Sequence, residues 1–178
     1  MTNAYRNGET IYLRPLERAD AARITPWLND PEVTRNLTMY RPLGLAEEEK
    51  RIEAIAEAKD DVIVGIVERE SDALIGVCGL HGVNDKNRRA MLGIVIGEKS
   101  RWGHGHGTEA TRLMVALAFE TLNLNRVWLD VFTDNERAVR CYEKVGFKRE
   151  GVMRQHAFRE GAYRDLHLMS LLRDEWRR

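Results

Sequence analysis

Apolar residues recur along the chain at two spacings, and each spacing predicts one type of secondary structure. Short apolar runs, alternating or continuous, predict strands over residues 9–15, 61–68, 74–81, 90–96, 126–132, 147–158 and 162–170. Apolar residues at helical spacing predict helices over residues 20–28, 46–59, 108–121 and 135–145. From residue 61 onward, three strands are followed by a helix, a strand, a helix and two strands. This order predicts an α/β (α+β) domain with one mixed sheet and helices on its faces.

Residue types at the ends of these segments support the boundaries. Asp20 is placed to cap the first helix, and Asn29-Asp30-Pro31 is a breaker that ends it. Gly146 is expected to cap the C-terminal end of the last helix. We expect a turn at Glu160-Gly161 to join the last two strands.

Length and composition fit one globular domain over residues 1–178. Hydrophobic residues are 43% and charged residues 31%, which argues against wholesale disorder. Lys plus Arg equals Asp plus Glu at 28 each, so a zero net charge gives no electrostatic signal for nucleic acid or an anionic membrane. We therefore expect neither nucleic acid nor a membrane as a partner.

Cysteine usage and the N-terminal residues bear on location. Cys78 and Cys141 lie in apolar segments without metal-ligand spacing, which is typical of free thiols in a reducing compartment and gives no reason to expect a metal. Residues 1–8 lack the apolar run of a signal peptide, and no window approaches the ~20 apolar residues that span a bilayer. We expect a cytoplasmic protein.

A glycine-rich segment lies between the strand that ends at Ile96 and the next helix. Its residues are Arg101, Trp102, Gly103, His104, Gly105, His106, Gly107 and Thr108. Free backbone amides and the positive end of a helix dipole would meet there, which favours a phosphate. Glycine lets the backbone approach the phosphate because no Cβ intervenes. Arg101, His104 and His106 are placed to add charge or donors.

Two common nucleotide patterns are excluded by one residue each. A Walker loop requires Lys directly after its last glycine, but Thr108 and Glu109 follow Gly107. A dinucleotide fingerprint that starts at Gly103 and Gly105 requires a glycine at position 108. The remaining phosphate-bearing cofactor with this strand, loop and helix is CoA. A flexible turn is the plain alternative, and two histidines without a third ligand are weak evidence for a metal.

A second motif favours CoA over the flexible turn and the metal. Residues 134–147 read Asp-Asn-Glu-Arg-Ala-Val-Arg-Cys-Tyr-Glu-Lys-Val-Gly-Phe. Together with the glycine-rich segment, one helix and one strand earlier, this motif resembles the GNAT acetyltransferase superfamily. Residues 13–16, 29–33 and 161–165 resemble the branch that contains ribosomal-protein N-terminal and spermidine acetyltransferases. The resemblance spans nearly the whole chain.

The resemblance implies a splayed mixed sheet of about six to seven strands with about four helices on its faces. It also implies that acetyl-CoA, as co-substrate, lies in the opening of the sheet. Carried over by position, the backbone of Ile94, Val95 and Ile96 would lie along the pantetheine arm. The amides of residues 101–108 would hold the pyrophosphate, and Asn135 would bond to the pantetheine. An amide near Val95 is placed to stabilise the oxyanion of the reaction.

Tyr142 is the residue for which the resemblance implies a catalytic role. It would lie near the thioester sulfur and protonate the departing thiolate, since an unperturbed Tyr pKa of about 10 is comparable with that of a thiol. Helical spacing also places Tyr142 on an apolar face with Ala138 and Val145, which predicts a core ring. Both interpretations hold if the ring packs and the hydroxyl faces the cleft. Asn135 has an alternative too, because Asn is a common helix N-cap.

The residue that takes the proton from the amine is left open. Many superfamily members place Glu in the part of the strand where this chain has Met91, and Met cannot act as a base. His81 and Glu109 are weaker candidates, because a lone His is more often structural and an acid at a helix start suits the dipole. Cys141 has no recognisable His partner for acyl-enzyme chemistry. Trp102 is a minor departure, since Gln or Arg is commoner there in the superfamily.

The predicted reaction is direct attack of a primary amine on acetyl-CoA in a ternary complex. The acceptor stays open among a protein N-terminus, a polyamine and another small amine. Glu47, Glu48 and Glu49 would suit a polyamine, although such a run is more often a solvated helix face. The alternative function is a non-catalytic acyl-CoA sensor that regulates a partner. A homodimer is common in the superfamily, and this sequence alone does not indicate one.

Overall fold

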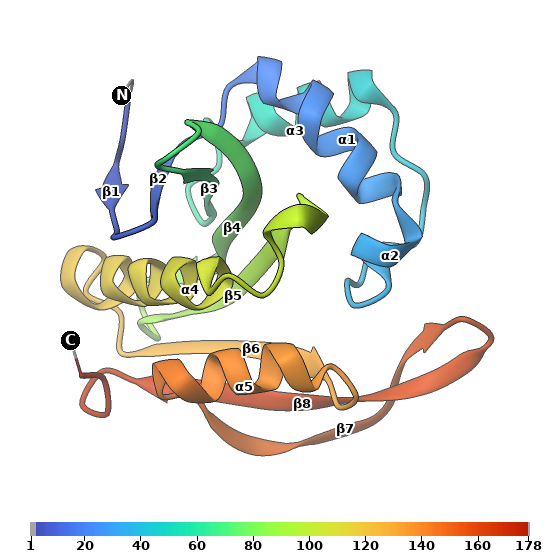
Figure 1. The fold of residues 1–178 in the computed structure, drawn as a ribbon. Coiled ribbons are helices and arrows are strands. Elements are labelled where there is room, and N and C mark those ends of the chain that lie inside the picture. Colours follow the sequence, from blue (N-terminus) through green and yellow to red (C-terminus); the bar gives the residue numbers. More distant parts are fainter. Residues whose placement is uncertain (1–2, 178) are drawn as a thin grey trace.

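The computed structural model describes residues 3–177, which form one open eight-stranded sheet with helices on both faces (Figure 1). The strands are β1 (Arg6–Asn7), β2 (Ile11–Pro15), β3 (Val62–Glu68), β4 (Ala73–Asn84), β5 (Arg89–Ile96), β6 (Arg126–Phe132), β7 (Lys148–Arg159) and β8 (Ala162–Leu172). Their order across the sheet is β1-β2-β3-β4-β5-β6-β8-β7. The helices are α1 (Ala21–Asn29), α2 (Pro31–Thr34), α3 (Leu45–Ile55), α4 (His106–Ala116) and α5 (Glu136–Val145). The predicted mixed α/β fold is confirmed. None of the helices in residues 3–177 is long and apolar enough to cross a membrane.

The numbers of strands and helices exceed the prediction, and two short elements account for this. β1 has two residues, too few to carry an alternating pattern, and pairs with β2 through Arg6 and Leu13. α2 begins directly after the breaker that ends α1. The Asp30 side chain accepts a hydrogen bond from the Glu32 amide at 2.8 Å, and Pro31 suits the first turn of a helix. The breaker therefore ends one helix and starts another.

The helix ends follow the prediction in α5 and depart from it in α1. Gly146 ends α5 in the left-handed conformation with φ of 110°. Asp20 occupies the N-cap position of α1, but its side chain makes no cap hydrogen bond. Its carboxylate instead pairs with Arg14 of β2 at 2.7 Å. The prediction that Asp20 caps α1 is therefore wrong, because a cation from a neighbouring strand takes the carboxylate.

The sheet opens between β5 and β6. These strands pair in parallel only from Arg89 and Arg126 to Met91 and Trp128. Beyond Met91, β5 stays paired with β4 and β6 stays paired with β8, so the two strands diverge (Figure 1). One edge of residues 92–96 is left without a strand partner. The splay implied by the resemblance is thus present, and it exposes backbone groups along β5.

Two hydrophobic cores hold helices on opposite faces of the sheet. α4 and α5 pack on one face through a core that includes Met114, Val139 and Leu129. α1 and α3 cover the first strands on the other face, where Ile24 and Ile52 are buried. Because side chains alternate along a strand, the residues of β6 on either side of Leu129 face away from the α4–α5 core.

Candidate active site

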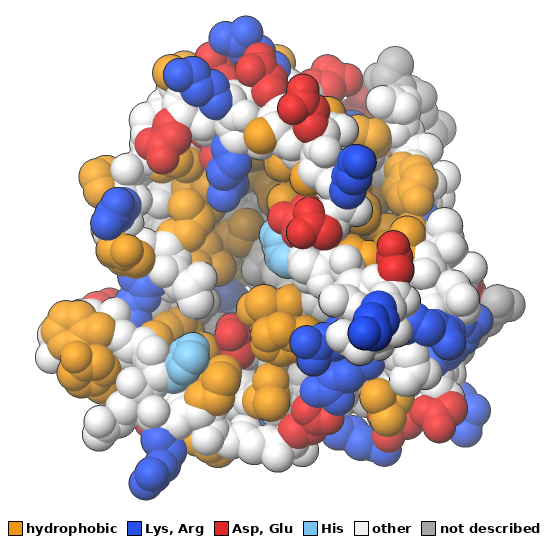
Figure 2. Space-filling view, turned by 180° about the vertical axis from the view of Figure 1, so that it is seen from behind, with side chains coloured by type: hydrophobic (Ala, Val, Ile, Leu, Met, Phe, Trp, Pro, Cys, Tyr) orange, Lys and Arg blue, Asp and Glu red, His pale blue; other side chains and the backbone are white. Residues whose placement is uncertain are grey.

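A cleft of about 630 Å³ occupies the opening between β5 and β6. On one face of the sheet its walls come from the glycine-rich segment, the start of α4 and α5, and on the other face from α2 and the residues after it. Figure 2 shows the hollow in the surface, with hydrophobic side chains around it and basic side chains gathered on one side. All of the predicted cofactor-binding residues line this cleft except His104.

The glycine-rich segment presents free amides at the N-terminus of α4. In the part of the chain that the structure describes, none of the backbone amides of residues 103–107 donates a hydrogen bond. Gly103 and Gly105 have φ of 84° and 87°, and a Cβ at either position would meet nothing within 4 Å. Free amides, a helix N-terminus and open space together suit a diphosphate. The segment therefore fits the pyrophosphate of CoA.

Trp102 ties the glycine-rich segment to the end of β5. Its indole Nε1 donates a hydrogen bond to the Ile96 carbonyl oxygen at 2.7 Å. The guanidinium carbon of Arg137, from α5, lies 4.6 Å from the centre of a Trp102 ring. A cation over an aromatic face is held by the ring quadrupole. Trp102 thus contacts the end of β5 directly and α5 through Arg137, and both Trp102 and Arg137 line the cleft.

The polar side chains of the segment make contacts away from the free amides. Arg101 pairs with Glu68 of β3 at 2.9 Å. Nδ1 of His106 lies 3.1 Å from the hydroxyl of Thr10, and burial lowers the pKa of His106, so its imidazole is neutral at pH 7. His104 is exposed and stacks on His106 with 6.0 Å between ring centroids. Among the described residues, no group of three or more metal-ligating side chains occurs.

Asn135 begins α5 and also lines the cleft. Its side-chain oxygen accepts a hydrogen bond from the Ala138 amide at 3.2 Å, so the N-cap interpretation holds. The cap uses only the oxygen of the side chain, and the NH₂ group stays available as a donor. The structure therefore allows the cap and the predicted contact with pantetheine together.

Tyr142 is buried and lines the cleft at the same time. Its side chain belongs to the α4–α5 core, with 8% of its surface exposed, and its ring centroid lies 5.9 Å from that of Phe147. Burial raises the pKa of Tyr142, and nearby Cys141 and Asp130 raise it further. The phenol is protonated at neutral pH, as a proton donor must be, and the raised pKa makes it a weaker acid than a free tyrosine.

The weaker candidates for a base have other partners. Glu109 accepts hydrogen bonds from the amide and the hydroxyl of Thr10, at 3.1 and 2.5 Å, on the β2 side of α4. His81 lies 3.3 Å from Asp61 and does not line the cleft. Met91 lines the cleft but has no group that accepts a proton.

Cys141 lies in the cleft wall, where it accepts a hydrogen bond from the Thr108 hydroxyl at 3.3 Å. Within residues 3–177 no histidine forms a hydrogen bond with Cys141, so the geometry gives a nucleophilic role no support. The acidic run in α3 also lies apart from the site. Glu48 is buried against Arg51 at 2.8 Å, and Glu47, Glu48 and Glu49 are all absent from the cleft wall.

Asp130 is a cleft residue that the sequence analysis missed. It lies in β6 between Leu129 and Val131, which are both buried in the α4–α5 core. Burial raises the pKa of Asp130, and His156 opposes this effect. The signal in the sequence was an acid at an alternate position of an apolar strand. That signal gains meaning only when the strand is known to border the opening.

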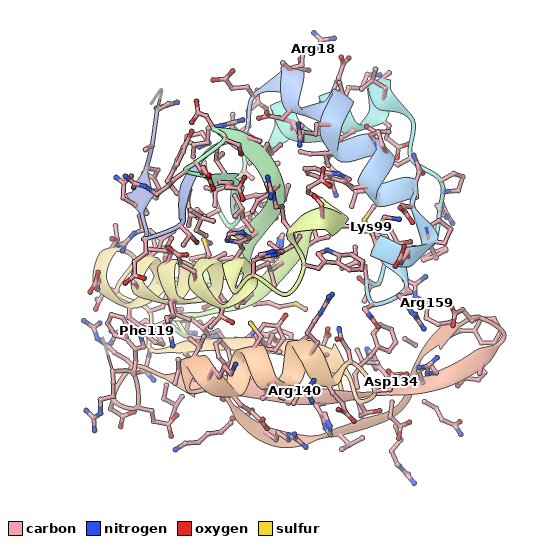
Figure 3. All side chains as sticks on the ribbon, in the orientation of Figure 1. Arg18, Lys99, Phe119, Asp134, Arg140 and Arg159 are labelled. Carbon is pink, nitrogen blue, oxygen red and sulfur yellow. The ribbon has the colours of Figure 1, made fainter. Side chains whose placement is uncertain are left out.

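The side chain of Arg159 connects two parts of the chain near the cleft, and we call this contact the clasp. Arg159, at the end of β7, donates hydrogen bonds to the backbone carbonyls of Leu37 and Met39, which follow α2 (Figure 3). Leu37 lines the cleft. Arg159 therefore ties the β7–β8 hairpin to the chain after α2.

The acetyltransferase (GNAT) domain family matches residues 10–148 of this chain. The chain belongs to the GNAT acetyltransferase family. The acetyltransferase is 31% identical over 168 residues to Uncharacterized N-acetyltransferase YoaA of Bacillus subtilis (strain 168), which covers 93% of this chain and 94% of that protein. It is 28% identical over 178 residues to spermidine N(1)-acetyltransferase of Escherichia coli (strain K12), which covers 96% of this chain and 90% of that protein.

A solved structure shares the fold. The crystal structure of spermidine N-acetyltransferase from Vibrio cholerae in complex with CoA and spermine superposes with a TM-score of 0.88 at 25% identity, and covers 94% of this chain and 98% of that one. The acetyltransferase accordingly uses acetyl-CoA as co-substrate and transfers its acetyl group to an amine. The alternative of a non-catalytic sensor is not supported.

Proposed function

We propose that the acetyltransferase acetylates a small polyamine-type primary amine by direct attack in a ternary complex. In this proposal the pantetheine of acetyl-CoA lies along Ile94, Val95 and Ile96, and its pyrophosphate lies on the free amides of residues 103–107. The amides of Arg101, Trp102 and Thr108 already donate to backbone carbonyls, so the predicted range of 101–108 is narrowed. The observation that supports it most is the position of Tyr142, whose phenol lines the same cleft as the free amides of the glycine-rich segment.

Each residue of the cleft has a task in this proposal. When bound, acetyl-CoA supplies the acetyl group and a thiolate leaving group. The NH₂ group of Asn135 bonds to the pantetheine arm while its oxygen caps α5. An amide near Val95 stabilises the oxyanion, and Tyr142 gives its hydroxyl proton to the sulfur.

The charges around the cleft favour a cationic acceptor. Arg137, Arg140 and Lys144 of α5 line it and suit the phosphates of CoA. The carboxylates in its wall are Asp130 of β6 and Glu32 of α2. A polyamine carries several ammonium groups at neutral pH and so matches carboxylates on the acceptor side. The spermidine acetyltransferases among the relatives act on amines of this kind.

The test is a screen of amines with released thiol as the readout. Spermidine, spermine, an aminoglycoside and peptides with free N-termini are each incubated with the protein and acetyl-CoA. We expect thiol release with the polyamines at a kcat/KM at least tenfold above that with the peptides. Faster release with the peptides would replace the polyamine by a protein N-terminus, the second acceptor that the sequence resemblance implies.

Location and assembly belong to the same proposal. Cys78 and Cys141 are both free, which supports a reducing compartment such as the cytoplasm. The family resemblance favours a homodimer, and sedimentation of the purified protein measures this directly.

A further inference from the structure

Asp130 stands where the amine must arrive. Along β6, Leu129 and Val131 are buried in the core under α4 and α5, and Asp130 between them faces the other side of the sheet. Its place in the strand lies beyond Trp128, the last residue of β6 that pairs with β5. Its side chain therefore borders the opening on the side of α2 and the β7–β8 hairpin, opposite the predicted cofactor helices.

Asp130 is a carboxylate without a protein partner. Within residues 3–177, no hydrogen bond or ion pair to its oxygens occurs, although it is only partly exposed. The other carboxylate of the cleft wall, Glu32, is already paired with Lys99 at 2.8 Å. A partly buried carboxylate without a partner is costly, and an ammonium ion is the group that would offset this cost.

Few charged groups act on Asp130. In α5, Tyr142 lies close enough to Asp130 that the carboxylate charge raises the pKa of the Tyr142 hydroxyl. Cys141 is the residue next to Tyr142 in the same helix. From β7, the His156 imidazole partly offsets the effect of burial on Asp130. The partner of Asp130 in β8 is the apolar Leu168. These surroundings raise the pKa of the carboxyl above its ordinary value, which makes the carboxylate a stronger base.

We propose that Asp130 binds the ammonium group of the acceptor and takes the proton that the amine must lose before it attacks. This inference rests on the proposed function and supplies the base that it lacks. The geometry is specific, because Asp130 and Tyr142 border one cleft and interact electrostatically. The other candidates do not fit, since Met91 cannot accept a proton and neither Glu109 nor His81 lines the cleft.

The protons balance with these two residues. The acceptor enters as an ammonium ion and gives one proton to the Asp130 carboxylate, which later releases it to solvent. The nitrogen lone pair forms the bond to the thioester carbonyl carbon, and the bond between carbon and sulfur breaks. Tyr142 gives its hydroxyl proton to the sulfur and regains one from the nitrogen. The products are the neutral amide, CoA thiol and one proton in solution.

The test is Asp130→Asn, which keeps the shape of the side chain and removes its charge and basicity. Spermidine is the acceptor, and kcat/KM is measured from pH 6 to pH 10. At pH 7 only about one in 10³ molecules of an alkylamine group with a pKa near 10 is uncharged. Without a base, the variant reacts only with the uncharged fraction of the amine. Its kcat/KM should therefore fall about 10²- to 10³-fold at pH 7. The loss should shrink about tenfold for each unit of added pH.

Two further variants make the result decisive. Asp130→Glu keeps a carboxylate and should keep the pH profile of the unchanged protein, with at least tenfold more activity at pH 7 than Asp130→Asn. Asp134→Asn removes an acid close by that pairs with Arg164 and does not line the cleft, and it should change kcat/KM less than threefold (Figure 3). The affinity for acetyl-CoA, measured by calorimetry, should match in all the proteins and shows that each is folded.

The outcomes separate this inference from the proposed function. A loss below threefold in Asp130→Asn overturns the assignment, and so does a large loss that is the same at every pH, which would indicate binding alone. If Asp130→Asn does not fold, a changed pH profile in Asp130→Glu overturns it instead. If the unchanged protein acetylates no polyamine, the proposed function fails first, and that result is visible before any variant is made.

Discussion

Replacement of Tyr142 by Phe separates the two tasks of this residue, packing and proton donation. The ring is buried in the α4–α5 core and contacts Phe147, and Phe keeps both of these contacts. The structure gives the hydroxyl no hydrogen bond within residues 3–177, so its removal leaves no buried partner unsatisfied. We therefore expect the free energy of unfolding to change by less than about 1 kcal/mol.

The expected kinetic effect is much larger than the effect on stability. A positioned general acid contributes about 10²- to 10⁴-fold to a rate, which corresponds to about 3–5 kcal/mol of transition-state stabilisation. Water that enters the cleft can replace part of that contribution. Turnover should therefore fall at least about tenfold, while the dissociation constant of acetyl-CoA changes less than about twofold.

The assay is thiol release at saturating acetyl-CoA and spermidine, with affinity for acetyl-CoA measured separately by calorimetry. Tyr163→Phe is the matched control, because Tyr163 is exposed at the far end of the β7–β8 hairpin, packs only against Phe158 among the described aromatic residues, and does not line the cleft. An unchanged turnover number in Tyr142→Phe would refute the assignment. A variant that loses turnover together with folding stability would show that the hydroxyl has a structural role.

Three further predictions concern the glycine-rich segment, the clasp and the sheet. Trp102→Ala removes a hydrogen bond to β5 and the contact with Arg137, so acetyl-CoA should bind about tenfold more weakly by calorimetry; an unchanged affinity contradicts the role of the glycine-rich segment in binding acetyl-CoA. Arg159→Met breaks the clasp and should raise KM for spermidine several-fold with acetyl-CoA affinity unchanged; equal changes in both would assign Arg159 to general stability. Arg126 lowers the pKa of Glu150 from 4.5 to about 2, so this pair stabilises the fold above pH 4.5 and loses that effect as the pH falls toward 2. With side chains 28% and 35% exposed, Glu150→Gln should cost about 1 kcal/mol at pH 7 in urea unfolding and much less at pH 2, where about half of the carboxylates are protonated; a cost as large at pH 2 as at pH 7 would contradict the pairing.

Elements with a strong local pattern were predictable from the sequence. The apolar run over residues 126–132 is β6 to the residue, because every second side chain is buried in one core. α5 was predicted with both of its caps, since Asn135 and Gly146 each satisfy the helix end next to them. β1 and α2 were missed because two and four residues are too few to show a period.

The backbone groups of the candidate site were predictable from the sequence. Free amides follow from the glycine positions and the start of α4, so the sequence alone pointed to residues 101–108, which line the cleft except for His104. Side-chain directions did not follow in the same way. Arg101 and His106 turn toward Glu68, a residue in a strand far away in the sequence. Asp130 matters only because pairing between β5 and β6 stops at Trp128, which is a property of the whole sheet.

The most direct test of the account is the product of one reaction. Spermidine, acetyl-CoA and the purified protein are incubated, and the amine is analysed by mass spectrometry while released thiol is measured in the same sample. We predict that spermidine gains one acetyl group and that one CoA thiol appears for each acetyl group transferred. Thiol release without an acetylated amine, or neither product with any acceptor in the screen, would contradict the assignment of this cleft as an amine acetyltransferase site.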